Sequence, residues 1–281
     1  MTHVLTKPEA SGLDGLRRRL PWRATGQPTS TFVAGLPLLL AFCLLWEMAP
    51  RLGWMNPIFF PPLTVVLQAL WDLTVSGTLA EHIAISFQRA GIGFALAVVI
   101  ALPLGALMGR YSAFERATDF LIQTLRNTSQ FALLPVFVLL LGIGEASKIA
   151  ITFYAAVFFL LINTIVGVKA VDPLLLKAAK SMGTSDWHLF RKVIFPSAIP
   201  SIVAGARLGI KASLFSVIAA EMLAARSGIG FLIQNASLLL KSAEMYAGIL
   251  TLTTVGLALN YALVWIERRA THWRATETGH A

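Results

Sequence analysis

Residues 172–200 read DPLLLKAAKSMGTSDWHLFRKVIFPSAIP, and this stretch decides how the rest of the chain is interpreted. It carries too many charges to cross a membrane and too many apolar side chains to be an ordinary solvated loop. Pro173 suits the first turn of a short helix, and Gly183 suits a left-handed position just after its end. Ser185 and Asp186 are favourable residues for the start of a second short helix. We therefore predict a helix–glycine–helix unit.

Apolar side chains line both predicted short helices. The first helix carries Leu174, Leu175, Ala178 and Ala179 on one face, and the second carries Trp187, Leu189 and Phe190. Pro196 and Pro200 are expected to end the second helix before the next apolar run. An amphipathic unit with a basic rim fits a groove of another protein. It fits the surface of a membrane equally well, and the residues alone leave both alternatives open.

The chain as a whole is strongly apolar. Of its 281 residues, 56% are hydrophobic and 13% are charged, whereas about a quarter of a soluble domain is charged. With a mean hydropathy of +0.71, these values exclude a disordered chain, a coiled coil and an ordinary soluble enzyme. They predict an all-α polytopic membrane protein. Six apolar runs have about the length of a membrane span: Phe32–Met48, Gly91–Met108, Phe120–Leu141, Ile149–Val168, Val203–Leu223 and Ala247–Ile266.

Small and interrupting residues mark several of these runs. Small residues recur every four positions at Ala97, Ala101, Gly105 and Gly109, and again at Gly205, Gly209 and Ser213. Such rows predict helices whose backbones pack closely. The third run is broken by the polar residues 127–130 and by Pro135. A break at membrane depth is tolerated where the backbone lines a cavity or is buried in protein.

The distribution of basic residues predicts the orientation. Fifteen of the 23 lysines and arginines lie in the two tails and in the second and fourth loops, and four lie in the loops on the other side. Basic loops stay in the cytoplasm, so we expect cytoplasmic tails at residues 1–30 and 269–281 around one transmembrane domain, residues 31–268. The net charge of +9 then reflects topology rather than nucleic-acid binding.

The sequence lacks the motifs of familiar catalytic sites. It has no phosphate-binding loop, no Gly-x-Ser-x-Gly elbow, no His-Glu-x-x-His pair and no dinucleotide fingerprint. Cys43 is its single cysteine, and the five histidines are scattered, so we expect neither a disulfide nor a metal site. We expect no catalytic residue and no cofactor in this chain. If ATP supplies energy, a partner must hydrolyse it.

The 172–200 stretch is similar to the cytoplasmic signature loop of permeases of ATP-binding-cassette (ABC) importers. That loop reads Glu-Ala-Ala, three residues, Gly, nine residues and Ile-x-Leu-Pro; here the matching residues are Lys177-Ala178-Ala179, Gly183 and Val193-Ile194-Phe195-Pro196. Lys177 replaces the acid of the family, and Val193 and Phe195 replace Ile and Leu. In the family this coupling loop docks into the ATPase. The resemblance implies an ATPase contact made by Lys177, Ala178, Ala179, Gly183, Trp187, Phe190 and Pro196.

Shorter motifs resemble one branch of these permeases, which serves nitrate, taurine and aliphatic sulfonates. They are Phe60-Pro61-Pro62, Leu125-Arg126-Asn127, Pro135, Gly142-Ile143-Gly144-Glu145, Gly205-Ala206-Arg207-Leu208, Ala220-Glu221-Met222 and Ser227-Gly228-Ile229-Gly230. The resemblance implies the type I importer permease fold, with about six transmembrane helices, in a bacterial inner membrane. It also implies a homodimer of this chain, a cytoplasmic ATPase dimer that binds ATP and Mg, and a periplasmic solute-binding protein.

Lys211 is the sharpest single candidate for the substrate path. It lies near the middle of the fifth run, where a lysine costs roughly 2.5–3.5 kcal/mol on insertion scales. One interpretation is that it faces the path and attracts an anionic substrate. The other is that it snorkels, or pairs with an acid such as Glu221 or with a helix C-terminus.

The polar break in the third run offers further candidates: Arg126, Asn127, Thr128, Ser129 and Gln130. These residues either line the substrate path and donate to oxyanion groups or cap a kinked helix. Asn163 and Thr164 fit hydrogen bonds between helices. Glu221 fits either a contact with the binding protein or a structural ion pair.

Two other classes of function remain to be weighed. An ion-coupled secondary transporter needs acids inside its spans, and here acids are scarce there. A membrane-embedded enzyme needs a catalytic cluster, which the motif search does not find. As substrate we expect a small organic anion such as taurine, a sulfonate or an aromatic carboxylate, which Lys211 and Arg126 favour, followed by nitrate and then by a neutral or cationic heterocycle.

Overall fold

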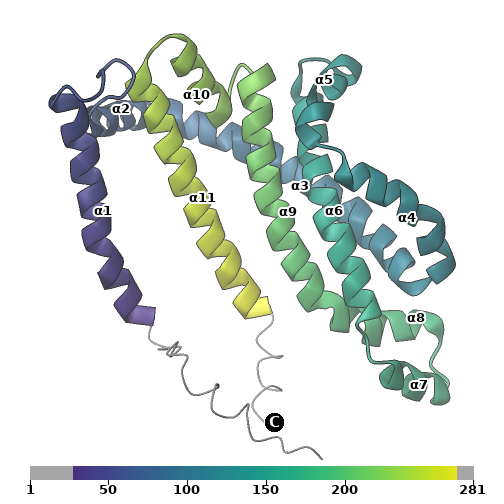
Figure 1. The fold of residues 1–281 in the computed structure, drawn as a ribbon. Coiled ribbons are helices and arrows are strands. Elements are labelled where there is room, and N and C mark those ends of the chain that lie inside the picture. The colour runs from purple at the N-terminus through teal and green to yellow at the C-terminus, as the bar shows by residue number, and fades with distance from the viewer. Residues whose placement is uncertain (1–27, 271–281) are drawn as a thin grey trace, which may run out of the picture. The chain divides into compact units, whose positions relative to one another are not determined.

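The computed structural model describes residues 28–270. The predicted tails, residues 1–30 and 269–281, lie largely outside the described residues. Every regular element within residues 28–270 is a helix (Figure 1). In chain order the helices are α1 (Pro28–Arg51), α2 (Leu63–Val75), α3 (Thr78–Arg110), α4 (Ser112–Asn127), α5 (Gln130–Leu141), α6 (Glu145–Lys169), α7 (Pro173–Ser181), α8 (Asp186–Leu189), the π-helical turn η1 (Phe190–Ile194), α9 (Phe195–Ala224), α10 (Ile229–Leu238) and α11 (Ser242–Ala270).

The chain divides into two compact units between Trp46 and Glu47. The first predicted run, Phe32–Met48, lies within α1, most of which belongs to the first unit. Phe42 and Trp46 contact each other edge to face on this helix, with ring centroids 5.9 Å apart. The described leucines of α1 are largely exposed, as suits a helix whose side chains meet lipid.

The other five predicted runs lie in the second unit. Within the described residues, four helical stretches are long and apolar enough to cross a membrane: α3, α6, the stretch from α8 through α10, and α11. The third run corresponds to α4 and α5, which together form a further candidate span bent by 96°. These helices confirm the predicted all-α polytopic fold.

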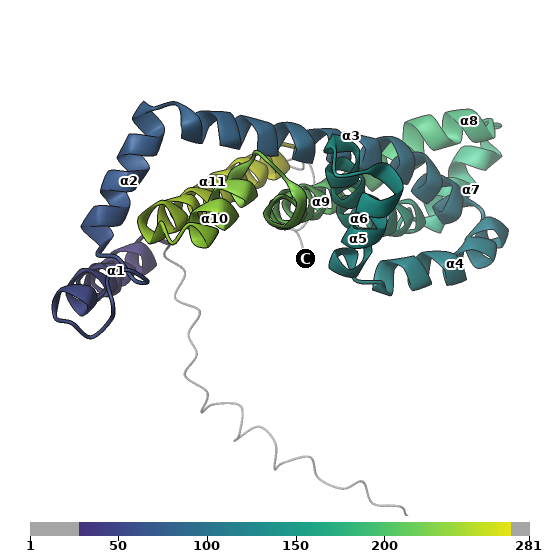
Figure 2. The same cartoon turned by 90° about the horizontal axis from the view of Figure 1, so that it is seen from above.

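Helices α3 and α9 both pack along α6, and α3 runs along one side of the other long helices (Figure 2). The predicted rows of small residues lie at these contacts. Ala97 and Ala101 are completely buried, and a Cβ atom added to Gly105 would lie 2.7 Å from the Cβ of Thr164. On the other side of α6, a Cβ on Gly167 would lie 3.0 Å from the Ala198 carbonyl oxygen. Glycine therefore sets the distance between the helix axes.

The bend between α4 and α5 occurs at Thr128 and Ser129, whose backbones are extended. This confirms the polar break that the sequence predicted. The expected second interruption, at Pro135, is wrong because α5 continues through that residue. Pro135 lies only five residues after the first residue of α5, so its missing N–H removes a single early hydrogen bond of the helix.

Pro196 and Pro200 do not end the helical stretch that begins at Asp186, contrary to the prediction. The stretch passes through η1, where the backbone N–H of Phe195 donates to the Phe190 carbonyl five residues earlier. Pro196, which has no backbone N–H, directly follows this turn as the second residue of α9, and the shifted hydrogen bonds of the turn accommodate it. Pro200 lies inside α9.

Candidate functional site

The coupling loop, residues 172–200, folds into the predicted helix–glycine–helix unit. Asp172 caps α7, because its Oδ1 accepts a hydrogen bond of 2.8 Å from the backbone N–H of Leu174. Gly183 follows α7 with a φ of +73°, a left-handed conformation that glycine adopts without strain. Arg110 at the end of α3 forms an ion pair of 3.3 Å with Asp186 of α8. These contacts fix the unit at the ends of α3 and α9.

The apolar face of the coupling loop is divided between two environments. Ala179 and Leu189 are buried and belong to a cluster with Val168, Val171, Ile194 and Ala198. We call its exposed apolar side the coupling surface; it consists of Leu174, Leu175, Met182 and Trp187, which are 71%, 54%, 78% and 67% exposed. The Trp187 ring stacks on Phe190 at 6.2 Å. Leu174, Leu175, Ala178 and Ala179, which were predicted to lie on one face of the first helix, differ in exposure: Ala179 is buried and the other three are exposed.

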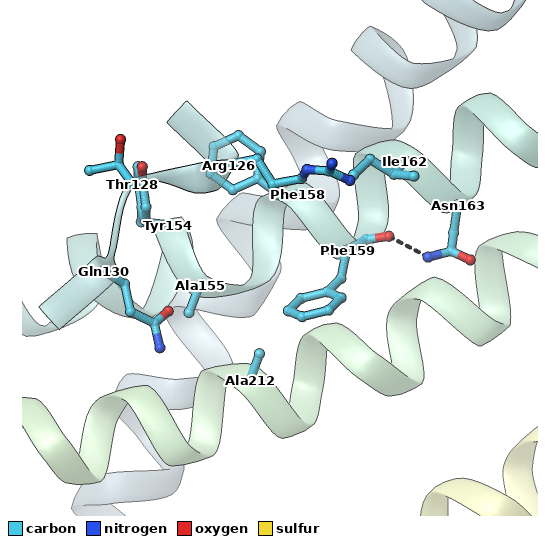
Figure 3. A pocket seen from close by; sticks show the side chains of 10 residues that line it. All are labelled: Arg126, Thr128, Gln130, Tyr154, Ala155, Phe158, Phe159, Ile162, Asn163 and Ala212. Carbon is cyan, nitrogen blue, oxygen red and sulfur yellow. Dashed lines mark hydrogen bonds between the residues drawn. The ribbon is translucent and has the colours of Figure 1, made fainter. Parts of the chain in front are cut away.

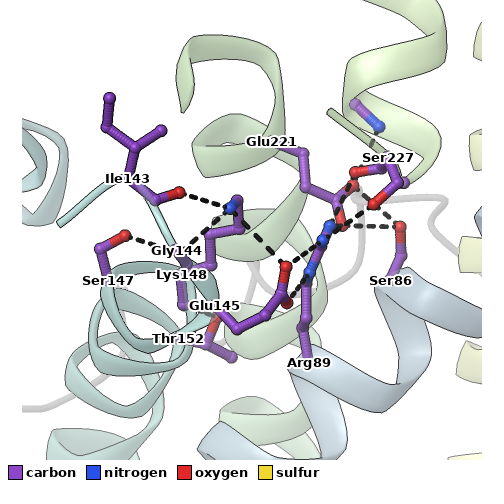
Figure 4. Close-up of polar contacts among 12 residues, drawn as sticks. Ser86, Arg89, Ile143, Gly144, Glu145, Ser147, Lys148, Thr152, Glu221 and Ser227 are labelled. Atoms are coloured by element: carbon purple, nitrogen blue, oxygen red, sulfur yellow. Dashed lines mark hydrogen bonds and ion pairs between the residues drawn. The ribbon is translucent and has the colours of Figure 1, made fainter. Parts of the chain in front are cut away.

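A buried ion network lies at the opposite end of the long helices, where α9 meets α10 (Figures 1 and 4). At its centre is Arg89 of α3, which is 3% exposed. Its Nη1 donates to Glu221 of α9 at 2.7 Å, and its Nε donates to Glu145 of α6 at 2.5 Å. The remaining N–H groups donate to Glu145 and to the carbonyl and hydroxyl oxygens of Ser227. One guanidinium therefore joins three long helices to the loop before α10.

The same network binds the first backbone N–H groups of α10, which have no partners inside that helix. The bonds run from Gly228 to His82 Nδ1 at 3.0 Å, from Ile229 to Ser86 Oγ at 2.9 Å, and from Gly230 to Glu221 Oε2 at 3.0 Å. Gly228 has a φ of +109°, which favours glycine. A Cβ on Gly228 would collide with the Glu221 carboxylate.

Three of the short motifs of the sequence meet in this network. They are the stretches 142–145, 220–222 and 227–230. Of the two alternatives for Glu221, the structure shows the ion pair. Sequence reasoning missed Arg89 and Ser86, because they are separated from Glu221 by 132 and 135 residues and share no local pattern with it. The available signal was an arginine at the edge of an apolar run, since a buried cation needs a partner.

A cavity of about 500 Å³ lies along the middle of α6 (Figure 3). It is bordered by the α4–α5 bend, by α6 and by Ala212 of α9. Its polar lining residues are Arg126, Thr128, Gln130, Tyr154 and Asn163, and its apolar ones are Ala155, Phe158, Phe159, Ile162 and Ala212. The Tyr154 hydroxyl donates to the Leu125 carbonyl, which ties the end of α4 to α6. The cavity thus has a polar and an aromatic part at mid-helix depth.

The structure brings some of the predicted path residues together and separates others. Arg126 and Gln130 line the cavity, whereas Asn127 and Ser129 are not among its lining residues. The side-chain amide of Asn127 donates to the Gln123 carbonyl at 2.9 Å, a local helix contact.

Lys211 lies away from this cavity's lining. Its Nζ donates to Oδ1 of Asn260 on α11 at 2.6 Å, so its partner is neither Glu221 nor a helix C-terminus. One turn earlier on α9, Arg207 forms an ion pair of 2.5 Å with Glu267, also on α11. Lys211 is therefore part of a polar contact between α9 and α11. Asn163 and Thr164 donate within α6 instead, to the carbonyls of Phe159 and Leu160.

Comparison with known proteins gives relatives along nearly the whole chain. It is 32% identical over 264 residues to the taurine transport system permease protein TauC of Escherichia coli, covering 91% of this chain and 94% of the relative. It is 31% identical to the aliphatic sulfonates transport permease protein SsuC of Bacillus subtilis, covering 98% and 100%. It is 30% identical to the nitrate import permease protein NrtB of Leptolyngbya laminosa, covering 89% and 95%.

Solved structures share the fold at lower identity. A chain of the MetNI methionine ABC transporter in an inward facing conformation matches with a TM-score of 0.59 and 17% identity, covering 77% of this chain and 99% of that one. A chain of an amino acid ABC transporter matches with a TM-score of 0.57 and 18% identity, covering 71% and 97%. The family described as the inner membrane component of binding-protein-dependent transport systems matches residues 97–272. The chain belongs to this family and is a permease of the ABC importer class.

Proposed function

We propose that this permease moves a small organic anion from an extracytoplasmic binding protein into the cytoplasm. Two copies of the chain form the membrane core, and a dimer of cytoplasmic ATPase subunits binds ATP and Mg and drives the cycle. The chain itself performs no catalysis. The observation that carries this proposal is the coupling surface, an exposed apolar patch held on a fixed backbone at the end of α9.

The composition of the coupling loop indicates what its partner offers. Leu174 and Trp187 are large apolar side chains that gain free energy when a groove covers them, about 1.5–3 kcal/mol for a leucine. Around them lie the exposed cations Lys177, Lys180 and Lys192. An apolar groove rimmed with acidic side chains complements such a surface. This favours a protein partner over a neutral lipid surface.

Movement of the coupling loop passes into the membrane through α9, the helix that continues from the end of this loop. The stretch from α8 through η1 into α9 has no break in its helical backbone. When ATP binding draws the two ATPase subunits together, the coupling surface moves with them, and α9 carries this movement into the membrane. Alternating access then follows from contacts that differ between the two states.

The class of substrate is inferred from the relatives and from the cavity. The relatives are named for taurine, aliphatic sulfonates and nitrate, all of which carry an oxyanion group. The cavity beside α6 is lined by Arg126 and by no carboxylate. Both observations support an anionic substrate.

An ion-coupled transporter is less well supported. Such a protein needs an acid that exchanges protons or sodium ions within the membrane. Glu221, the fully buried acid among the described residues, is held by Arg89, Ser86 and Gly230. A carboxylate with its lone pairs occupied in this way is suited to a structural role.

The test compares two tryptophans of equal exposure. Trp187 of the coupling surface and Trp71 of α2 are 67% and 68% exposed. In the complex purified with its ATPase and binding protein, we expect Trp187→Ala to lower substrate-stimulated ATPase activity about tenfold or more, as for an interface hot spot. Trp71→Ala should leave it unchanged. The proposal is wrong if no ATPase copurifies with the chain, or if the two substitutions have equal effects.

A further inference from the structure

We propose that the cavity beside α6 is a substrate site with two parts, in which Arg126 binds an oxyanion group and the aromatic wall holds an apolar body. The site is specific for organic sulfonates or carboxylates with an aromatic or bulky apolar group, and it disfavours nitrate. This inference rests on the proposed function, since it assigns the substrate class of the same permease.

The charge of the cavity is positive and uncompensated. Arg126 is its single charged lining residue, and none of the ion pairs found in residues 28–270 involves it. In Figure 3 its guanidinium extends along α6 toward Ile162 rather than away from the cavity. A guanidinium presents paired N–H donors that match the oxygens of a carboxylate or sulfonate. The cavity therefore selects an anion.

Amide groups supply further donors in the same cavity. Gln130 lines the cavity at the first residue of α5. Asn163 donates one N–H of its amide to the Phe159 carbonyl at 2.8 Å, which leaves its second N–H and its oxygen for a ligand. Thr128 and Tyr154, by contrast, already donate to backbone carbonyls. Arg126 thus supplies the charged donors for the anionic group, whereas the Gln130 amide lies at the other end of the lining (Figure 3).

The remaining wall is apolar and aromatic. The rings of Tyr154 and Phe158 contact each other edge to face, with centroids 5.1 Å apart, so each limits the movement of the other. Phe159 follows on the same helix, and Ala155 and Ala212 leave space opposite it (Figure 3). Fixed aromatic faces stabilise an aromatic or alkyl group through burial and ring contacts.

The size of the cavity agrees with an organic ligand. At about 500 Å³ it falls within the range of pockets for organic molecules, about 300–1,000 Å³. Nitrate would fill a small part of it and would leave the aromatic wall unused. An arylsulfonate would place its charge on Arg126 and its ring against Phe159.

The test measures equilibrium binding to the permease–ATPase complex in lipid nanodiscs. The binding protein is left out, so that its own specificity does not affect the measured affinities. The probes are benzenesulfonate, ethanesulfonate and nitrate. We expect benzenesulfonate to bind tightest and nitrate weakest. Arg126→Met should weaken both sulfonates about tenfold or more, while Phe159→Ala should weaken benzenesulfonate alone.

Arg116→Met provides the matched control, because Arg116 is an exposed arginine on the same helix, α4, and does not line the cavity. It should change no affinity, and the midpoint of thermal unfolding should be the same for all variants. Binding of nitrate as tight as that of benzenesulfonate, an unchanged Arg126→Met variant, or no detectable binding at all would overturn the inference. Copurification of the ATPase tests the proposed function separately, so the two failures are distinguishable.

Discussion

At the scale of single residues, Arg89 is the centre of the buried ion network. Its guanidinium has five N–H groups, and each of them has an acceptor on Glu145, Glu221 or Ser227. The two acids differ in environment, since the side chain of Glu221 is completely buried and that of Glu145 is 60% exposed. The ion pair of Arg89 with Glu221 and its ion pair with Glu145 should therefore contribute very differently to the free energy of unfolding.

We expect Glu221→Gln to lower the stability of the folded chain by about 3–5 kcal/mol, the cost of removing one partner of a buried ion pair. The amide would also turn an NH₂ group toward the donors of Ser86 or Gly230. Glu145→Gln should cost about 1 kcal/mol or less, because water screens the exposed partner. Thermal unfolding in detergent measures both. Equal losses would contradict the assigned geometry.

The residue scale is also where sequence reasoning was weakest. A lysine in an apolar run is easily recognised, so Lys211 was predicted to face the substrate path. Its contact is instead with Asn260, 49 residues away in sequence, and joins α9 to α11. Arg126 and Gln130, which the sequence grouped by adjacency in the chain, both line the cavity. Asn163, which completes the polar lining of the cavity, belongs to another helix. Contacts between distant segments have no signature in a single sequence.

At the scale of helices, glycine rows determine how closely α6 approaches its neighbours. Two glycines of α3 provide a matched comparison. A Cβ on Gly105 would meet Thr164 at 2.7 Å, whereas a Cβ on Gly91 would have nothing within 4 Å. The periodic spacing of small residues predicted this packing, because a row every four positions lies on one side of a helix.

Gly105→Ala should therefore destabilise the helix pair by about 1–3 kcal/mol, the usual cost of overpacking. Gly91→Ala should be neutral or stabilising by up to about 1 kcal/mol, because alanine is the better helix former. The midpoints of thermal unfolding give the comparison directly. A stabilising Gly105→Ala would mean that α3 and α6 are further apart than described.

Helix ends were harder to predict than helix interiors. Pro173 and Gly183 acted as the expected start and stop signals, since α7 begins at Pro173 and Gly183 follows its end in a left-handed conformation. Pro196 and Pro200 were misleading, since the preceding π-helical turn shifts the hydrogen bonds and lets the helix continue. That turn leaves no mark in the residue pattern.

At the scale of the whole molecule, the charge distribution predicts the orientation in the membrane. In a Cys43→Ser background, Met182→Cys places a thiol on the coupling surface, and Leu239→Cys places one beyond α10, at the other end of the long helices. Both parent residues are well exposed, at 78% and 59%. We expect a membrane-impermeant maleimide added to intact cells with a permeabilised outer membrane to label position 239 and not position 182.

Inside-out vesicles give a second measurement of the same two positions. Labelling of both positions there would mean that the vesicles leak, so Cys43→Ser vesicles loaded with a quencher serve as the control. The reverse pattern in cells would contradict cytoplasmic tails. The all-helical class and the helix–glycine–helix unit were accessible from composition and spacing alone, whereas six apolar runs were predicted and the described residues contain four candidate spans, or five with the bent pair α4–α5. The ion network and the two-part cavity were not accessible in this way, since they depend on which faces of the helices meet.

The unbroken stretch from Asp186 to Ala224 has a mechanical consequence. At about 1.5 Å per residue it is a lever roughly 58 Å long, and a tilt of about 10° moves one end by roughly 10 Å relative to the other. Trp187 stands at one end and Glu221 at the other. A displacement at Trp187 that passes the π-helical turn and Pro200 reaches Glu221, so the contacts of Glu221 with Arg89 either move with the helix or break.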